Sequence, residues 1–365
     1  MTILKRTKLY DFHLANNAKI VPFNGWEMPL NYQNGISKEH FNTRNKSSLF
    51  DVSHMGQLEI TGKNAELFLK KLIPTDLENL DDGNVKYSMF LNENGGIIDD
   101  LMIYRLDGKI NLVVNAGRLY EDIRFLETNI IENVNIHHKV DYSLIAIQGP
   151  KSREIIKKFG LDLNKFYFMK AKKIKLDGVI CSITCCGYTG EDGFELSVKS
   201  SEIEKIVNLI LSSDDITLAG LGARDTLRME AGLPLWGKEI SEKINPIEAN
   251  LQFALNKNKI ENLDFHGSKN IAREILLGPE KKLVGLLPQQ NRPIRDGAKL
   301  FYEGKDIGYV TSGGFSPTLN KPISIGFIKN SLIKRNRRFE TKIGEKVYTL
   351  QITTLPFVKH NYYRR

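Results

Sequence analysis

The eleven residues Cys186-Gly187-Tyr188-Thr189-Gly190-Glu191-Asp192-Gly193-Phe194-Glu195-Leu196 combine a glycine-rich turn with the start of an alternating strand. Glycine adopts positive φ angles without strain, so Gly190 and Gly193 predict a tight turn. Beyond this turn apolar and polar side chains alternate, which places Glu195 on the face opposite its apolar neighbours. The turn therefore fixes where the carboxylate of Glu195 is held.

A fixed carboxylate beside Tyr188 is suited to paired hydrogen bonds with the N–H groups of a flat heterocycle. The same residues also fit a solvent-exposed Glu195 that follows a simple hairpin. Both interpretations stay open when only these eleven residues are considered.

The length and composition of the chain indicate a multidomain globular protein. Its 365 residues exceed one ordinary hydrophobic core, so two or three domains are expected. Hydrophobic residues make up 41% and charged residues 26%, which is typical of globular proteins. No apolar run approaches the roughly 18 residues of a spanning helix, and residues 1–10 lack the apolar core of a secretory signal. We therefore expect a cytoplasmic protein without a membrane partner.

The three cysteines, Cys181, Cys185 and Cys186, are odd in number and form no CxxC pair, so neither a disulfide framework nor a zinc site is predicted. We interpret them as small core residues, with a catalytic thiol as the alternative. P-loop, GxSxG, HExxH and EF-hand motifs are also missing from the sequence, so no metal is expected.

Positive charge is concentrated at the C-terminal end. Residues 331–365 hold nine Lys or Arg and two Glu, a net charge of +7 out of +9 for the chain. Such a segment suits an acidic partner protein, an anionic ligand tail or nucleic acid, and a merely solubilising basic face is the alternative.

A second pair of acids lies in a predicted hairpin. Asp107-Gly108 separates the apolar runs 97–104 and 109–115, and a two-residue Asp-Gly turn is a strong hairpin signal. Asp99 and Asp100 are neighbours on the first strand, so one points to each face. Burial in a pocket would raise the pKa of the inward carboxyl group and offer its charge to a developing cation. The pattern does not say which acid faces inward, and both could instead bind backbone near a turn.

Apolar periodicity predicts helices over 64–73, 118–133, 150–159, 201–211 and 218–231. In the last of these, Arg224 and Arg228 share a face, and one of them could pair with the pocket carboxylate or a ligand oxygen, with a surface or interdomain ion pair as the alternative. His54 is interpreted as a structural residue. From Lys282 onward, short strands and frequent glycines predict an all-β domain.

Several of these motifs, in this order, resemble the T-protein family of the glycine cleavage system, which are tetrahydrofolate-dependent aminomethyltransferases. The resemblance covers nearly the whole chain. The matching stretches are Thr7–His13, Phe50–Met55, Gly95–Asp100, Cys186–Glu195, Ala223–Leu233, Thr311–Gly313 and Asn361–Tyr363.

The resemblance implies an α+β fold in which three domains form a cloverleaf around a central folate pocket. Antiparallel sheets with helices would form the first two domains, and a β-barrel or jelly roll the third. Residues 1–50 with 140–265 would make the first domain, 51–139 the second and 280–365 the third.

The resemblance also implies the site residues. Asp100 would be the catalytic carboxylate, and Glu195 would bind the N–H edge of the pterin ring with Arg224 as its partner or as a second pterin contact. The residues expected to line the folate site are Met55, Tyr87, Asn115, Tyr188, Glu195, Arg224 and Tyr362.

The implied reaction transfers a methylene unit from the aminomethyl-lipoyl arm of H protein to tetrahydrofolate and releases ammonia, giving 5,10-methylenetetrahydrofolate. The partner would be lipoylated H protein, and no nucleic acid is expected. A tetrahydrofolate-dependent demethylase of a small methylated sulfonium or amine compound is the alternative. A non-enzymatic folate-binding module, with the basic segment as a nucleic-acid face, is a third possibility.

Overall fold

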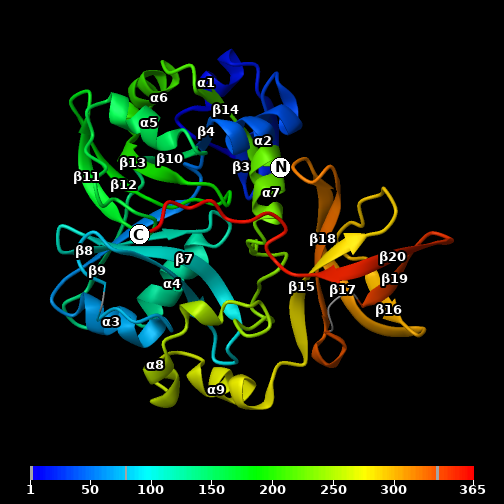
Figure 1. Cartoon of the computed structure of the whole chain (residues 1–365). Coiled ribbons are helices and arrows are strands. Elements are labelled where there is room, and N and C mark those ends of the chain that lie inside the picture. Colours follow the sequence, from blue (N-terminus) through cyan, green and yellow to red (C-terminus); the bar gives the residue numbers. More distant parts are fainter. Residues whose placement is uncertain (1–2, 79, 334–336) are drawn as a thin grey trace.

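The computed structural model describes residues 3–78, 80–333 and 337–365, and Figure 1 shows three lobes around a common centre. Two lobes are built on a six-stranded and a five-stranded sheet, and the third is a closed six-stranded barrel. The predicted α+β class with a C-terminal barrel is confirmed. The limits of the three domains stay a prediction.

The six-stranded sheet has the order β11-β12-β13-β10-β4-β14. Helices α5 and α6 cover one of its faces, and their isoleucines pack with strand residues in a continuous core. The elements are β4 (Ser47–Asp51), β10 (Tyr142–Gln148), α5 (Ser152–Lys158), β11 (Ala171–Leu176), β12 (Val179–Thr184), β13 (Gly193–Lys199), α6 (Ile203–Leu211) and β14 (Ile216–Leu218).

The five-stranded sheet has the order β6-β7-β8-β5-β9, with α3 and α4 on one face. Its elements are β5 (Gly56–Thr61), α3 (Ala65–Leu72), β6 (Val85–Leu91), β7 (Ile97–Leu106), β8 (Lys109–Val114), α4 (Leu119–Thr128) and β9 (Asn135–His138). The predicted Asp-Gly hairpin is present between β7 and β8. Asp107 and Gly108 both have positive φ, 51° and 71°, as the tight turn requires.

Helix α4 is shorter than the predicted 118–133. It ends at Thr128, and Asn129 follows as its C-cap. Ile130 and Ile131, which extended the apolar pattern in the sequence, are exposed, and Asn133 has a φ of 59° that no α-helix contains. The prediction of the helix end was therefore too long, because Ile130 and Ile131 continue the apolar pattern without packing in the core.

The other faces of the two sheets turn toward each other. Phe50, Leu144 and Ala146 from the first sheet share a buried cluster with Val85 and Tyr104 from the second. Each sheet therefore has a helix-covered face and a face toward the other sheet. A side chain reaches the molecular centre only if its strand parity places it on this inner face.

The remaining segments connect the lobes. A small sheet, β1-β3-β2, lies with α1, α2 and α7 beside the six-stranded sheet, whereas α8 and α9 lie on the side of the five-stranded sheet (Figure 1). Residues between Ile240 and Ile271 pack with β6, β7 and the barrel. The bounds are β1 (Lys5–Arg6), α1 (Tyr10–Ala15), β2 (Lys19–Phe23), β3 (Trp26–Asn31), α2 (Gly35–Asn45), α7 (Leu221–Glu230), α8 (Lys257–Glu261) and α9 (Ser268–Leu277).

The barrel closes in the order β15-β18-β17-β16-β19-β20. After it, the chain leaves the barrel and returns to the centre of the molecule, as the red segment of Figure 1 shows. We call residues 354–365 the C-terminal arm. The strands of the barrel are β15 (Lys281–Pro288), β16 (Lys299–Tyr302), β17 (Lys305–Ser316), β18 (Lys321–Lys329), β19 (Arg338–Ile343) and β20 (Lys346–Thr353). Within the described residues, every helix is too short or too polar to cross a bilayer.

A buried ion pair joins α7 to the barrel. Nη1 of Arg228 donates to Oε2 of Glu239 at 2.9 Å, and Nη2 donates to Oγ of Ser312 on β17 at 2.8 Å. Arg228 is 2% exposed and Glu239 is 0% exposed. Neither charge is therefore solvated by bulk water. Arg228 also forms an ion pair with the exposed Asp225, whereas the counter-charge of the buried Glu239 is Arg228.

Replacing Arg228 by leucine should lower the free energy of unfolding by about 3–5 kcal/mol, because the carboxylate of Glu239 is left buried without its counter-charge. The double variant Arg228→Leu/Glu239→Leu should lose much less, since no buried charge remains. Urea denaturation of the three proteins measures this. Equal losses in the single and the double variant would show that the ion pair is not the cause.

Candidate functional site

Strand register places both predicted carboxylates on the inner faces. Glu195 lies opposite Ala146 in β10, a member of the buried cluster between the sheets. Asp100 shares its face of β7 with Met102 and Tyr104, which belong to the same cluster. The open choice in the acid pair is thereby resolved, because Asp100 faces the other sheet and Asp99 faces the side covered by α4.

Asp100 is held by two donors. The hydroxyl of Tyr87 donates to Oδ2 at 3.0 Å, and Nδ2 of Asn115 donates to Oδ1 at 2.7 Å. Asn115 also donates to Asp99 from its backbone N and from Nδ2, both at 2.9 Å. Burial raises the pKa of Asp100, and these donors offset part of the rise.

Glu195 is 8% exposed, and burial raises the pKa of its carboxyl group. The charge of Arg224 opposes this rise, and so does the thiol of Cys186, which lies 3.5 Å from Oε2. No hydrogen bond or ion pair joins Glu195 to Arg224 within the described residues. The expected partnership of these two residues is therefore an attraction through space, which leaves both groups available to a ligand.

Arg224 and Tyr188 connect the two acids. The guanidinium of Arg224 lies 4.9 Å from the centre of the Tyr188 ring, and its Nη1 is buried without an acceptor among the described residues. The Tyr188 hydroxyl donates to the carbonyl of Pro234. Burial raises the pKa of Tyr188, Arg228 opposes the rise, and the nearby charge of Asp100 adds to it. Asp100, Tyr188, Arg224 and Glu195 thus form one continuous group of neighbours.

The C-terminal arm closes the site from outside. The Tyr362 ring stacks on Phe168 with a centroid distance of 4.0 Å. The backbone N of Asn361 donates to the carbonyl of Gly190 at 2.7 Å, and its side chain donates to Glu191 at 3.0 Å. The arm is thereby fastened to the glycine-rich turn that precedes Glu195.

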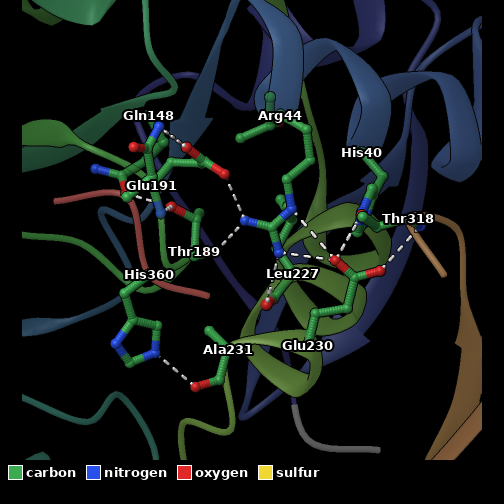
Figure 2. A network of polar contacts seen from close by, with 12 residues as sticks. His40, Arg44, Gln148, Thr189, Glu191, Leu227, Glu230, Ala231, Thr318 and His360 are labelled. Carbon is green, nitrogen blue, oxygen red and sulfur yellow. Dashed lines mark hydrogen bonds and ion pairs between the residues drawn. The ribbon is translucent and has the colours of Figure 1, made fainter. Parts of the chain in front are cut away.

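A buried arginine organises the same turn (Figure 2). Nη1 of Arg44 donates to the carbonyl of Thr189 and to Glu191, each at 2.8 Å. Nη2 donates to Glu230 at 2.8 Å, and Glu230 also accepts from Thr318 of the barrel. One side chain of α2 therefore connects the turn, α7 and, through Glu230, the barrel.

Comparisons with known proteins identify the family. Residues 9–259 match the "GCVT N-terminal domain" family and residues 281–359 the "Glycine cleavage T-protein C-terminal barrel domain" family. The chain belongs to the glycine cleavage T-protein family. It is therefore an aminomethyltransferase, as predicted, and the comparisons do not support the demethylase alternative.

Individual T-protein relatives agree over the full length. The mitochondrial aminomethyltransferase of Dictyostelium discoideum is 40% identical, with 98% of this chain and 94% of the relative aligned. The aminomethyltransferase of Caldanaerobacter subterraneus subsp. tengcongensis is also 40% identical, with 98% of this chain and 97% of the relative aligned. The crystal structure of glycine cleavage system aminomethyltransferase T from Bartonella henselae superposes with a TM-score of 0.95 at 37% identity, covering 99% of this chain and 100% of that one.

The structure brings the sequence-predicted T-protein residues toward one region. Met55 packs against the buried cluster between the sheets, and Tyr87 lies opposite Met102 on the inner face of β6. Asn115 holds the acid pair, and Tyr362 reaches the site on the arm. Their roles as folate contacts stay predictions.

Sequence reasoning missed two contributors. The sequence favours Cys186 as a core residue, with a catalytic thiol as the alternative, and neither interpretation includes the hydrogen bond that its thiol donates to Glu195. Cys186 lies in the same short segment as Glu195, and this proximity is the signal that could have indicated the contact. Arg44 had no signal at all, because its partners Thr189 and Glu230 are 145 and 186 positions away in the chain.

A hollow of about 480 Å³ lies beside this site. Phe253, which lines it, packs against the Tyr87 ring at 5.7 Å, and Phe168, which also lines it, stacks on Tyr362. Its lining residues are Tyr167, Phe168, Met169, Lys170, Phe253, Arg364 and Arg365. The hollow therefore combines aromatic walls with three cationic side chains.

The residues of the site suit an organic ligand better than a metal. Among the described residues no group of three or more His, Cys, Asp or Glu side chains could hold a metal ion. The unused donor of Arg224 and the sparsely bonded carboxylate of Glu195 instead offer one donor and one acceptor to a polar ring.

His54, next to Met55, generates a prediction about pH. It is 4% exposed and its Nδ1 has no partner among the described residues. Burial lowers its pKa to about 4, opposed by Asp51 and reinforced by Arg224. Below its ordinary pKa of about 6.5 the unfolded chain takes up a proton at His54 that the folded chain refuses, so stability is lost as the pH falls from 6.5 toward 4.

Wild-type protein should therefore lose about 2 kcal/mol more than His54→Gln between pH 7 and pH 5, as measured by urea denaturation. The exposed His137→Gln serves as the control and should behave like the wild type. An identical pH dependence in wild type and His54→Gln would contradict a buried neutral imidazole.

Proposed function

We propose that this aminomethyltransferase moves a methylene unit from the aminomethyl-lipoyl arm of H protein to tetrahydrofolate and releases ammonia. The observation that carries the proposal is the placement of Glu195 and Asp100 on the facing inner sides of two sheets, with the unpaired donor of Arg224 near Glu195. One acid is positioned to bind a ring and the other to act on a transient cation.

Glu195 and Arg224 recognise the ring of the acceptor. The carboxylate of Glu195 has one thiol donor in this structure and can accept paired N–H bonds from a pterin edge. Nη1 of Arg224 can donate to a ring oxygen or nitrogen, because it has no acceptor within the described residues. A ligand with complementary polar edges binds these buried groups. A ligand without such edges leaves them unpaired, which costs binding free energy.

Asp100 acts at the reacting carbon. Breaking the bond between the aminomethyl carbon and its sulfur or nitrogen builds positive charge, which a carboxylate in a dry site stabilises. Tyr87 and Asn115 hold its oxygens, so little reorganisation is needed when the charge develops. Its raised pKa also brings it closer to neutrality, where a carboxylate can take up or return a proton.

The hollow beside the site suits the anionic tail of the acceptor. Lys170, Arg364 and Arg365 would attract the glutamate carboxylates, while the aromatic walls contact the benzoyl ring. We also propose that the basic C-terminal segment attracts H protein electrostatically. The cytoplasm stays our prediction for the location, and no nucleic-acid partner is proposed.

Asp100→Asn should keep the shape of the site and lose turnover by about a hundredfold or more, because the amide cannot carry the charge that opposes the developing cation. Ammonia release from aminomethyl-lipoyl H protein with tetrahydrofolate measures it. Binding of tetrahydrofolate, measured by calorimetry, should change little.

The exposed Asp214→Asn is the control and should retain full activity. Near-normal turnover of Asp100→Asn would remove this residue from the mechanism. Wild-type protein that releases ammonia equally well without tetrahydrofolate would count against folate as the acceptor.

The double variant Lys170→Gln/Arg364→Gln should raise the KM for tetrahydrofolate about tenfold and leave kcat within about twofold, because partly exposed charge pairs each contribute at most about 1 kcal/mol. Steady-state kinetics at low salt measures both constants. Lys305→Gln, at an exposed lysine of the barrel that lies outside the basic C-terminal segment, is the matched control. An unchanged KM for tetrahydrofolate would place the anionic tail elsewhere.

A further inference from the structure

The glycine-rich turn contains an acid, Asp192, that has no part in the proposed reaction. Its carboxylate accepts two hydrogen bonds from one guanidinium on α5. Nε of Arg153 donates to Oδ2 at 2.6 Å, and Nη2 of the same residue donates to Oδ1 at 3.2 Å. The side chains of Arg153 and Asp192 are only 12% and 9% exposed. A two-point pair of this kind fixes the orientation of both planar groups, so it holds the turn against α5.

The guanidinium of Arg153 also contacts the C-terminal arm. Its Cζ lies 4.0 Å from the centre of the Tyr363 ring, within the range of a cation–π contact. The Tyr363 ring also stacks on Tyr167, with a centroid distance of 5.4 Å and an interplanar angle of 18°. Nη1 of Arg153 donates to the carbonyl of Phe166, the residue before Tyr167, at 2.8 Å. One side chain therefore contacts the turn, the arm and the segment on which the arm stacks.

The two acids of the turn hold the arm on either side of Tyr362. The side chain of Asn361, the preceding residue, donates to Glu191 at 3.0 Å. The backbone N of Tyr363, the following residue, donates to Oδ1 of Asp192 at 3.4 Å. The turn that positions Glu195 at the start of β13 thus also fixes the backbone around Tyr362.

We propose that Arg153 is a positioning residue for the binding of tetrahydrofolate, which holds Asp192 and the ring of Tyr363 together so that Tyr362 stays in the folate site. The proposal rests on the function proposed above, in which Tyr362 contacts the acceptor. Arg153 itself touches neither substrate, and its loss leaves the chemical step at Asp100 unchanged.

The chemistry of arginine explains why this position needs more than a positive charge. A planar guanidinium binds a carboxylate through two N–H groups, keeps a third donor for the carbonyl of Phe166 and presents a flat face to Tyr363. The ammonium group of a lysine is a compact charge, which can pair with Asp192 but cannot stack on the ring at the same time. Arg153→Lys should therefore restore only part of the function that Arg153→Met loses.

Replacing Tyr363 breaks the contact from the side of the arm. Its side chain is 48% exposed, so Tyr363→Leu should fold normally. Without the ring, the KM for tetrahydrofolate should rise about tenfold, while kcat at saturating tetrahydrofolate and the KM for H protein stay within about twofold. Tyr363→Phe keeps the ring and should match the wild type. Tyr309→Leu, at an exposed tyrosine of the barrel, is the matched control.

A double variant separates one shared contact from two independent effects. Arg153→Met should raise the KM for tetrahydrofolate about as much as Tyr363→Leu does. The variant Arg153→Met/Tyr363→Leu should be no worse than about twofold beyond either single variant, because both changes remove the same interaction. A double variant whose KM rises by the product of the two single effects would overturn the proposal, and so would a fall in kcat with an unchanged KM.

Hydrogen exchange of the arm tests the positioning without an assay of activity. In Arg153→Met and in Tyr363→Leu, the backbone amides of residues 357–365 should exchange about tenfold faster than in the wild type, whereas Tyr363→Phe and Tyr309→Leu should show no change. If Arg153→Met does not fold, Tyr363→Leu decides alone.

Unchanged exchange of the arm in folded variants would overturn the proposal. Faster exchange with an unchanged KM for tetrahydrofolate would overturn it as well, because a loosened arm would then not affect the acceptor. If wild-type protein transfers no methylene unit to tetrahydrofolate, the proposed function fails, and the exchange measurement still decides whether Arg153 holds the arm.

Discussion

The central region of this molecule depends on the buried guanidinium of Arg44. It binds Glu191 and Glu230, two acids from different parts of the chain, and both are almost fully buried (Figure 2). Glu230 also binds Ser316 and Thr318 of the barrel, and Glu191 binds the C-terminal arm. Because the site lies where the lobes meet, its geometry is only as fixed as this junction.

The supply of donors separates the acids that hold the fold from those that are free to act. Burial alone would raise the pKa of Glu230, but bonds from His40, Ser316 and Thr318 outweigh it and lower the pKa to about 2. Glu195 has one thiol donor and a distant guanidinium, and its pKa is raised. The carboxylate of Glu230 thus holds the fold together, whereas that of Glu195 keeps lone pairs that a ligand can use.

The sequence predicts correctly those features that depend on residues within about ten positions of one another. The Asp107-Gly108 hairpin follows from turn chemistry, and the placement of Glu195 on the face opposite its apolar neighbours follows from strand alternation. The choice between Asp99 and Asp100 was not accessible, because β7 is apolar on both faces and helix α4 covers one of them. The contacts of Arg44 could not be predicted either, because its partners are distant in the chain and only the packing of the lobes brings them together.

The position of the acids within their sheets explains how a dry site can hold unsatisfied charge. Strand β13 is paired on both sides by β12 and β10, and β7 is paired on both sides by β6 and β8. Neither backbone can relax toward its side chain without breaking two ladders of hydrogen bonds. The acids are thus kept at fixed points, and their charge is not dissipated by local rearrangement. The C-terminal arm has no strand neighbours of this kind, so the position of Tyr362 depends instead on the hydrogen bonds of Asn361 to the glycine-rich turn and on stacking against Phe168.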